Sequence, residues 1–170
     1  KNGRPVRVTG VITDITERKR MEDALRGSEE RCRAFLEQAR DAILVLELPT
    51  DGPPVIRDAN TAALLMHGYP REELIGRPVS MLDAEQASPP LVKERVLRAQ
   101  SADGAAFETL HRRKDGAVFD VEVSVKEVSA GGKRLAIDIT RDITERRKAE
   151  EALRQSETRY RTIFEQADDY

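Results

Sequence analysis

The chain has 170 residues, of which 39% are hydrophobic and 35% charged, so it can form one compact core with charged segments outside it. Its 29 basic and 31 acidic residues leave a net charge of −2, which argues against a general affinity for nucleic acid or anionic membranes. No stretch reaches the roughly 18 apolar residues of a membrane span. No apolar signal-peptide region follows Lys1, and the lone cysteine, Cys32, excludes an internal disulfide and a cysteine-based zinc site. We therefore expect a soluble, cytoplasmic fragment without a nucleic-acid partner or direct membrane contact.

One segment of the chain occurs twice. Residues 14–41 and 142–169 are identical at 17 of 28 positions, at an offset of 128 residues. This period is too long for a solenoid repeat and matches a whole domain with its linker. We therefore expect one complete domain at 41–144, between connector helices at 16–40 and 145–170, the second of which leads into a following domain.

Residues 1–15 precede the first copy of the repeat. In this segment Val6, Val8, Gly10 and Ile12 alternate with polar or small residues, as in a β-strand. We interpret it as the C-terminal strand remnant of a preceding domain.

Both copies of the repeat are predicted to be helices. Thr16 and Thr144 are expected to be their N-caps, each offering its hydroxyl to free N–H groups of the first turn. Loss of the Thr144 hydroxyl would then cost about 1 kcal/mol of helix stability. Pairs of Glu and Arg four residues apart support both helices: Glu22–Arg26, Glu29–Arg33, Glu150–Arg154 and Glu157–Arg161.

Each predicted helix also carries a stripe of apolar or small residues at alternating four- and three-residue steps. The stripes are Met21, Leu25, Ser28, Cys32 and Phe35, and Ala149, Leu153, Ser156, Tyr160 and Ile163. Such a stripe fits a parallel dimeric coiled coil, and the alternative is that each helix packs on its own domain. We expect a homodimer that forms through these helices.

The first half of the central domain alternates short strands and short helices. Asn60 is expected to cap a helix that ends at Gly68, and Pro70 to open another. The predicted elements are strands at Ala42–Leu46 and Val55–Arg57, helices at Thr61–Met66 and Arg71–Leu74, and a longer helix at Leu91–Ala99.

The second half consists of strands joined by tight turns at Asp115–Gly116 and Gly131–Gly132. The strands are expected at Ala106–Arg112, at Phe119–Val125 and from Leu135 to Ile143, and in the last two of them apolar residues alternate with other residues. The fold class is therefore α+β, a five-stranded antiparallel sheet with short helices on one face.

Three motifs of the central region resemble the PAS family in its S-box/PAC form. Asp58–Leu64 followed by Gly68–Gly76 looks like the first-helix signature of the family. Arg112–Gly116 followed by Phe119 looks like its central hairpin, and Asp142–Lys148 is similar to its exit motif. The resemblance covers about residues 30–148, and Asp14–Thr16 repeats the exit motif of a preceding PAS domain.

This resemblance implies a signal-transfer and dimerisation module of a bacterial multi-PAS protein. The parent expected from it is a sensor histidine kinase of a two-component system, and the alternatives are a diguanylate cyclase or a phosphodiesterase. Its partners are then adjacent PAS domains of the same chain. We expect the fragment itself not to be an enzyme, because His67 and His111 are its only histidines and no nucleophile or phosphate-binding motif accompanies them.

The resemblance also raises the question of a cofactor, and we expect neither haem nor flavin. Haem-binding PAS domains use a histidine on the long helix before the central hairpin, and Leu91–Ala99 has none. His67 is expected to be solvated at a helix end, whereas His111 shares the strand parity of Phe107 and could point inward. Cys32 lies outside the domain, and the chain has no tryptophan and few aromatic residues for flavin stacking. An unidentified small ligand in a cavity of the sheet is the alternative function.

No metal, cofactor or catalytic residues are predicted. The residues expected to relay a signal are those of the two exit motifs: Asp142, Ile143, Thr144, Asp14 and Thr16. A bland interpretation is that Asp142 ends a strand and Thr144 caps a helix. The family interpretation is that the same contacts couple the sheet to the output helix.

Overall fold

The computed structural model describes residues 14–85 and 88–167, and the predicted strand remnant at 1–15 therefore lies almost entirely outside the described residues. The chain divides into two compact units, Lys1–Leu36 and Glu37–Tyr170. The described part of the first unit belongs to helix α1, Thr16–Gln38, apart from the two residues before it. α1 has no buried residue, and Met21, Leu25 and Phe35 of its stripe are 62%, 61% and 74% exposed.

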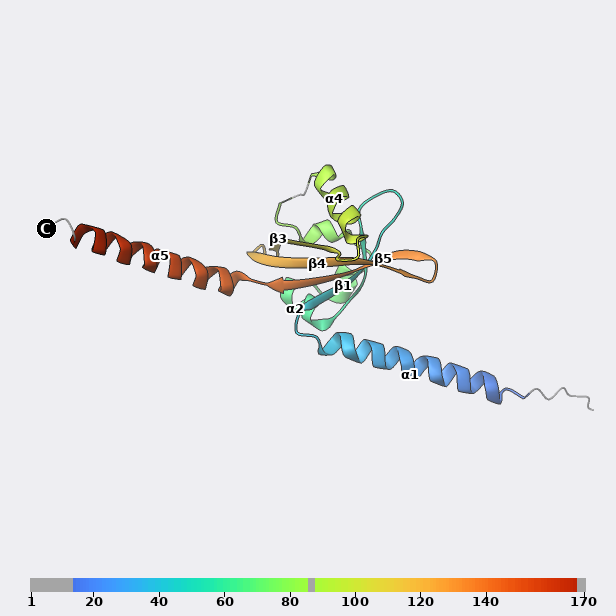
Figure 1. The fold of residues 1–170 in the computed structure, drawn as a ribbon. Coiled ribbons are helices and arrows are strands. Elements are labelled where there is room, and N and C mark those ends of the chain that lie inside the picture. The colour runs from blue at the N-terminus through green and yellow to red at the C-terminus, as the bar shows by residue number, and fades with distance from the viewer. Residues whose placement is uncertain (1–13, 86–87, 168–170) are drawn as a thin grey trace, which may run out of the picture. The chain divides into compact units, whose positions relative to one another are not determined.

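The second unit contains a five-stranded antiparallel sheet, which confirms the predicted fold class (Figure 1). Its strands are β1 (Ala42–Glu47), β2 (Val55–Ala59), β3 (Ala105–Arg112), β4 (Val118–Ala130) and β5 (Lys133–Asp142). They lie in the order β2-β1-β5-β4-β3, so the last strand in the chain is the central one. Between β2 and β3 come α2 (Thr61–His67), α3 (Arg71–Leu74), the short 3₁₀ helix η1 (Val79–Leu82) and α4 (Pro89–Ala99).

One face of the sheet is buried. Its inward residues have a single parity, since Leu44 pairs with Asp138, and Val123 pairs with Thr140. The core beneath them joins strand residues to α2, α3 and η1: Ala42, Leu44, Leu46, Leu48, Ile56, Ala59, Ala63, Leu74, Leu82 and Ala136. On the opposite face Ile139 is 40% exposed.

β5 places its small and polar residues inward. Ala136, Asp138 and Thr140 are buried, whereas Leu135 and Ile137 are half-buried and face the other way. The alternation of this strand is thus as predicted, but its large apolar residues do not face the core.

Asn60 joins α2 to β1. Its Oδ1 accepts hydrogen bonds from the backbone N of Ala63 and of Ile43, both at 2.9 Å, and its Nδ2 donates to the Asp41 carbonyl at 3.0 Å. The predicted N-cap is therefore confirmed, and the same side chain also binds the N-terminal end of β1. At the other end of α2, Gly68 adopts a left-handed conformation with φ +73° and donates its N–H to Leu64 O, as is typical of a glycine that caps the C-terminus of a helix.

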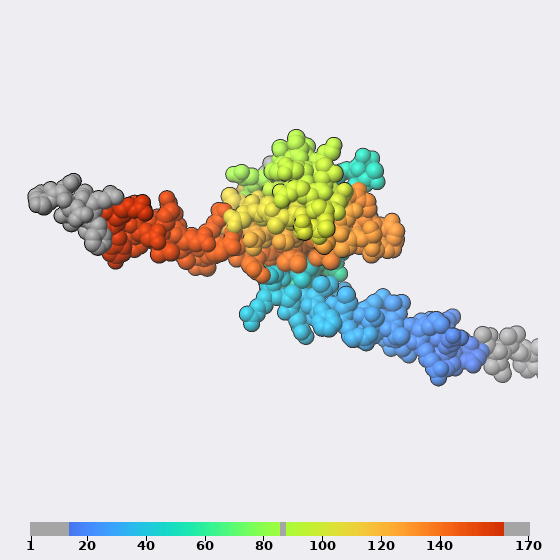
Figure 2. All heavy atoms as spheres, in the orientation of Figure 1, coloured from blue at the N-terminus to red at the C-terminus, as the bar shows by residue number. Residues whose placement is uncertain are grey.

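β5 leads directly into α5, Thr144–Ala167 (Figure 1). In both long helices the ion pairs differ from those predicted: Arg26 binds Asp23, and Arg154 binds Glu151, three residues before each arginine. In the described part of α5, the side chains after the first turn are exposed, and in Figure 2 no other element covers them on the visible face.

Candidate functional site

Two groups of polar residues in the second unit are candidates for function. The first is an interior polar cluster formed by His67, His111, Asp83, Asp138 and Thr140. The second is an exit junction formed by Asp142, Ile143 and Thr144, where β5 becomes α5.

The two histidines form the centre of the interior polar cluster. His67 is fully buried at the end of α2, and His111 is 5% exposed on β3. His67 Nε2 lies 3.0 Å from His111 Nδ1, and His67 Nδ1 lies 3.0 Å from the Ala63 carbonyl oxygen. The Phe119 ring packs against both imidazoles, at centroid distances of 5.8 and 6.2 Å.

Burial keeps both imidazoles neutral at physiological pH. It lowers the pKa of His67, and it lowers the pKa of His111 to about 3, with further contributions from the neighbouring His67 and Arg95. The expectation of a solvated His67 was therefore wrong. The sequence signal that could have found it is the four-residue spacing of Ala63 and His67, which places both on the buried face of α2.

Two carboxyl groups complete the interior polar cluster. Asp83 follows η1, and its Oδ1 lies 3.8 Å from His111 Nε2. Asp138 is 5% exposed on the central strand and accepts a hydrogen bond from Thr140 Oγ1 at 2.8 Å. Burial raises the pKa of each aspartate to about 6, and the charge of Asp83 adds to the effect at Asp138.

The cluster does not fit the ligation of haem iron. His67 uses both ring nitrogens in contacts with Ala63 and His111, so neither is free to bind iron. His111 Nε2 has no hydrogen bond, but it faces Asp83 at 3.8 Å. Cys32 is exposed on α1, in the other unit. Among the described residues, no group of three or more His, Cys, Asp or Glu could hold a metal ion.

The exit junction is held by backbone and side-chain contacts of three successive residues. Asp142 Oδ1 accepts a hydrogen bond from the Thr144 backbone N at 2.9 Å. Ile143 is 2% exposed and donates its N–H to Asp120 O at 3.0 Å. Asp142 therefore caps α5 and Ile143 anchors it in the core.

The predicted cap by the Thr144 hydroxyl is not formed. Thr144 is the first residue of the helix, and its Oγ1 is buried without a hydrogen-bond partner. The capping acceptor is the side chain two residues earlier, because Asp142 rather than Thr144 precedes the first helical turn. The same arrangement begins α1, where Thr16 N donates to Asp14 Oδ1 at 2.8 Å. The hydrogen bonds from Thr16 also lower the pKa of Asp14.

Arg113 links the exit junction to the interior. Its Nη2 donates to Asp142 Oδ2 at 3.0 Å, and its Nη1 donates to the carbonyl of Met66 at the end of α2. The guanidinium carbon lies 4.0 Å from the centroid of the Phe119 ring, which is the ring that packs against both histidines. Sequence reasoning missed this residue, although it lies within the central hairpin motif.

Ion pairs hold the first turn of α5 to β3 and β4. Arg146 Nη2 lies 2.7 Å from Glu108 Oε1, and Arg147 Nη1 lies 2.6 Å from Asp120 Oδ1. Arg147 also binds Glu108, and this hydrogen bond is the main cause that raises the pKa of Arg147. All four side chains are partly exposed to solvent, which screens the charges, so each pair contributes little to stability.

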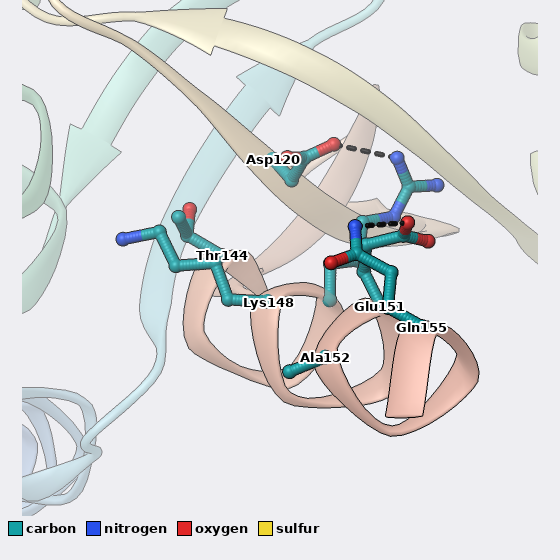
Figure 3. Close-up of a pocket in the computed structure, with 7 residues that line it drawn as sticks. Asp120, Thr144, Lys148, Glu151, Ala152 and Gln155 are labelled. Atoms are coloured by element: carbon teal, nitrogen blue, oxygen red, sulfur yellow. Dashed lines mark hydrogen bonds and ion pairs between the residues drawn. The ribbon is translucent and has the colours of Figure 1, made fainter. Parts of the chain in front are cut away.

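A groove of about 390 Å³ runs between β4 and α5 beside the exit junction (Figure 3). Asp120 forms the strand side of the groove. The helix side consists of Thr144, Arg147, Lys148, Glu151, Ala152 and Gln155. Two pairs of polar groups bind each other within the lining, Arg147 with Asp120 and Gln155 with Glu151, as the dashed lines in Figure 3 show. The groove is thus a feature of the way in which α5 leaves the sheet.

A family model and two curated relatives match most of this chain. The family model described as "PAS domain" matches residues 40–145. The sensor protein FixL of Bradyrhizobium diazoefficiens is 28% identical over 152 residues, which cover 87% of this chain and 29% of FixL. Sporulation kinase E of Bacillus subtilis is 29% identical over 158 residues, which cover 91% of this chain and 20% of the kinase. This chain thus spans less than a third of each relative.

A solved structure extends the similarity to three dimensions. The PAS domain of an HTR-like protein from Haloarcula marismortui superposes with a TM-score of 0.61 at 31% identity, covering 74% of this chain and 99% of that one. In the described part of this chain, none of the helices has the length and apolar composition that a bilayer crossing requires.

Proposed function

The chain belongs to the PAS domain family, and from this premise we propose that it transfers a conformational change from its interior to α5 through the exit junction. It is a sensory domain of the kind found in signalling proteins, homologous to sensor histidine kinases. The PAS domain is itself a non-catalytic module. A change that enters the domain must therefore leave it as a change in structure.

The contacts of Arg113 carry this proposal. One guanidinium binds the end of α2, lies over Phe119 and pairs with Asp142, which caps α5. Movement of α2 or of the Phe119 ring would therefore alter the position of the Asp142 carboxylate. Because that carboxylate holds the first backbone N–H of α5, its displacement would loosen or reorient the start of the helix.

The same contacts suggest a role for each residue of the exit junction in the relay. In this role Asp142 transmits the displacement, Ile143 is the fixed point in the core, and Thr144 is the first residue that moves. Asp14 and Thr16 form the same local turn at the start of α1, and we assign them the equivalent role for a preceding domain.

The domain organisation that we propose has four parts. Residues 41–144 are the PAS domain, with connector helices at 16–40 and 145–170, and 1–15 end a preceding PAS domain. The internal repeat supports this division, since an exit motif begins each helix. The similarity to FixL and to sporulation kinase E supports a multi-domain parent of the sensor histidine kinase class. We propose further that this parent is cytoplasmic in this region and dimerises through the connector helices, whose apolar stripes are exposed.

Hydrogen exchange of the backbone amides tests the relay. Phe119→Leu should loosen the packing around the Arg113 guanidinium, and we expect exchange in the first two turns of α5 to be about threefold faster or more. Arg113→Gln should give the same increase, and the double variant should not add to it, because both changes act through one contact.

The matched control is Leu97→Ala, which removes an exposed side chain of α4. It should leave α5 unchanged. Amides of β1 report any general loss of stability, so a Phe119→Leu variant that speeds exchange equally in β1 and α5, or not at all in α5, argues against the relay.

Direct sensing of a small molecule is a second candidate function. The interior polar cluster supports it, because buried carboxyl and imidazole groups with unused hydrogen-bonding capacity are common in ligand-binding sites. Native mass spectrometry and an absorbance spectrum of the purified chain decide it. A consistent extra mass or a chromophore would make the domain a primary sensor. A protein without any bound ligand would leave the relay as the proposed function.

A further inference from the structure

The hydrogen bonds of the interior polar cluster have a fixed direction. The Ala63 carbonyl oxygen can only accept, so His67 Nδ1, 3.0 Å away, carries a proton. A neutral imidazole has one N–H and one lone pair, and therefore His67 Nε2 is an acceptor. The proton between the two rings must then belong to His111 Nδ1, which donates to His67 Nε2 at 3.0 Å.

The chain of donors ends at His111 Nε2. This nitrogen carries the lone pair of a neutral ring, because the Nδ1 proton is already assigned. Opposite it, Asp83 Oδ1 lies at 3.8 Å, longer than a hydrogen bond. An ionised carboxylate is also only an acceptor, so two acceptors face each other inside the domain with no proton between them.

The surrounding charged groups do not supply the missing donor. His67 on α2 and Arg95 on α4 act on the pair, Asp83 in turn acts on Asp138 of β5, and Arg113 after β3 acts on His67. The Arg95 guanidinium carbon lies 3.9 Å from the centroid of the Phe107 ring. In the part of the chain that the structure describes, neither His111 Nε2 nor the Asp83 carboxyl accepts a hydrogen bond.

We propose that Asp83 and His111 Nε2 bind one proton between them and thereby form a proton-binding site inside the domain. This inference goes beyond the relay and does not depend on it. Burial raises the pKa of Asp83 to about 6 and lowers that of His111 to about 3, so the proton resides on the carboxyl group, which donates to the imidazole.

Proton binding should change the geometry at the end of η1. A protonated Asp83 can approach His111 from 3.8 Å to a hydrogen-bonding distance of about 2.7 Å. An ionised Asp83 carboxylate would instead face the lone pair of His111 Nε2 with no proton between them. The backbone near this carboxyl is fixed to β3, since Ala84 N donates to Leu110 O at 2.9 Å. The site therefore tightens the contact between η1 and β3 at low pH and relaxes it above about pH 6.

Nitrogen-15 NMR of the imidazole rings tests the site in the unmodified chain, which has only two histidines. At pH 7.5 we expect both rings to carry their proton on Nδ1, the less common tautomer of a free imidazole. On lowering the pH to 5, the His111 Nε2 shift should move as a hydrogen bond forms, while the His111 ring stays neutral. An Nε2–H tautomer at either ring, or a charged His111 at pH 6, overturns the proposal.

Two variants identify the carboxyl group that titrates. Asp83→Asn places a permanent N–H donor opposite His111 Nε2, so the pH-dependent shift between pH 5 and 7.5 should disappear and its low-pH position should persist. Asp51→Asn, which removes an exposed carboxylate from the β1–β2 turn, should leave the shift unchanged.

Asp138→Asn separates the two buried carboxyl groups. The titration at His111 should survive in this variant, displaced in pH by the loss of a neighbouring charge. A titration that survives in Asp83→Asn and disappears in Asp138→Asn would assign the proton to Asp138 and refute the proposed site. If Asp83→Asn does not fold, the tautomers of the unmodified chain still decide the question.

Discussion

At the scale of single residues, Asp142 and Thr144 have different tasks at the start of α5. Asp142→Ala removes the acceptor for the Thr144 N–H and the partner of Arg113, and we expect it to lower the free energy of unfolding by about 1–2 kcal/mol. Thr144→Ala removes a hydroxyl that has no hydrogen bond, so its effect should stay within about 0.5 kcal/mol. Urea unfolding measures both values.

The repeat provides a control for this comparison. Asp14→Ala deletes the same cap from α1, which belongs to the other unit, and should leave the urea midpoint of the domain unchanged. A larger loss for Thr144→Ala than for Asp142→Ala would contradict the assignment of the cap.

Asp138 makes the stability of the domain dependent on pH. Burial raises its pKa in the folded state to about 6 from an ordinary value of 3.8. The folded state therefore binds this proton more tightly than the unfolded chain does, and the free energy of unfolding falls as pH rises from about 4 to about 6. A difference of about two between the folded and unfolded pKa values corresponds to about 3 kcal/mol in the free energy of unfolding.

Asn in place of Asp138 resembles the protonated acid and does not titrate. Between pH 4 and pH 7, the free energy of unfolding of Asp138→Asn should rise by up to about 3 kcal/mol relative to that of the unmodified chain. Urea unfolding at the two pH values measures this gain. The buried histidines contribute equally to both proteins, so parallel stability profiles would show that Asp138 has no raised pKa.

Residues differ in how far their roles can be read from the sequence. The cap at Asn60 was predictable, because a cap depends on the next three residues. The partner of His67 and the burial of Asp138 were not predictable, because both depend on residues far away in the chain. His67 meets His111 44 positions later, and Asp138 lies opposite Leu44 on β1.

At the scale of elements, the alternation in each strand was enough to predict strands and turns but not the face that is covered. β4 buries Phe119, Val121 and Val123, as its apolar positions suggest. β5 buries Ala136, Asp138 and Thr140 instead, because it is the central strand and small inward residues leave room for the side chains of its neighbours. That reason becomes visible only when the order of the strands is known.

The turn between α4 and β3 is closely packed at Gly104. This residue has φ +73°, and a Cβ at its position would lie 2.6 Å from the carbonyl oxygen of Val125 on β4. Gly104→Ala should therefore cost more than the roughly 1–2 kcal/mol of a left-handed alanine, because the backbone of β4 must also shift.

Gly131→Ala is the matched variant for this prediction. Gly131 has φ +58° in the β4–β5 turn, and a Cβ there would meet no atom within 4 Å. Gly131→Ala should lose only the stability that a left-handed alanine costs, without a steric clash. Its urea midpoint should therefore lie between those of the unmodified chain and Gly104→Ala. Equal losses in the two variants would show that the contact with Val125 is relieved at no cost.

At the scale of the whole molecule, the connector helices present apolar side chains that no described part of the chain covers. Leu25 and Leu153 occupy equivalent places in the two stripes, and each is 61% exposed. We expect sedimentation analysis to show a dimer at micromolar concentration. Replacing both leucines with Glu should weaken it at least tenfold, because a charge at the centre of a coiled-coil stripe disrupts the packing.

The control replaces an exposed leucine outside the stripes. Leu97 of α4 is 55% exposed, and Leu97→Glu should leave the dimer intact. A monomeric unmodified chain, or equal weakening by Leu97→Glu, would place the contact between copies elsewhere or exclude it.

The central position of β5 has a consequence for synthesis on the ribosome. β1 emerges first, but its inner partner is β5, and Ala42 pairs with Thr140 almost 100 residues later. Until β5 leaves the exit tunnel, the β1–β2 pair and the β3–β4 hairpin are two separate pieces with open edges. Native pairing can then form in one late step, just before the first turn of α5 is made. A nascent chain stalled near residue 130 should accordingly be protease-sensitive and bound by chaperones, whereas the complete, released chain should be resistant.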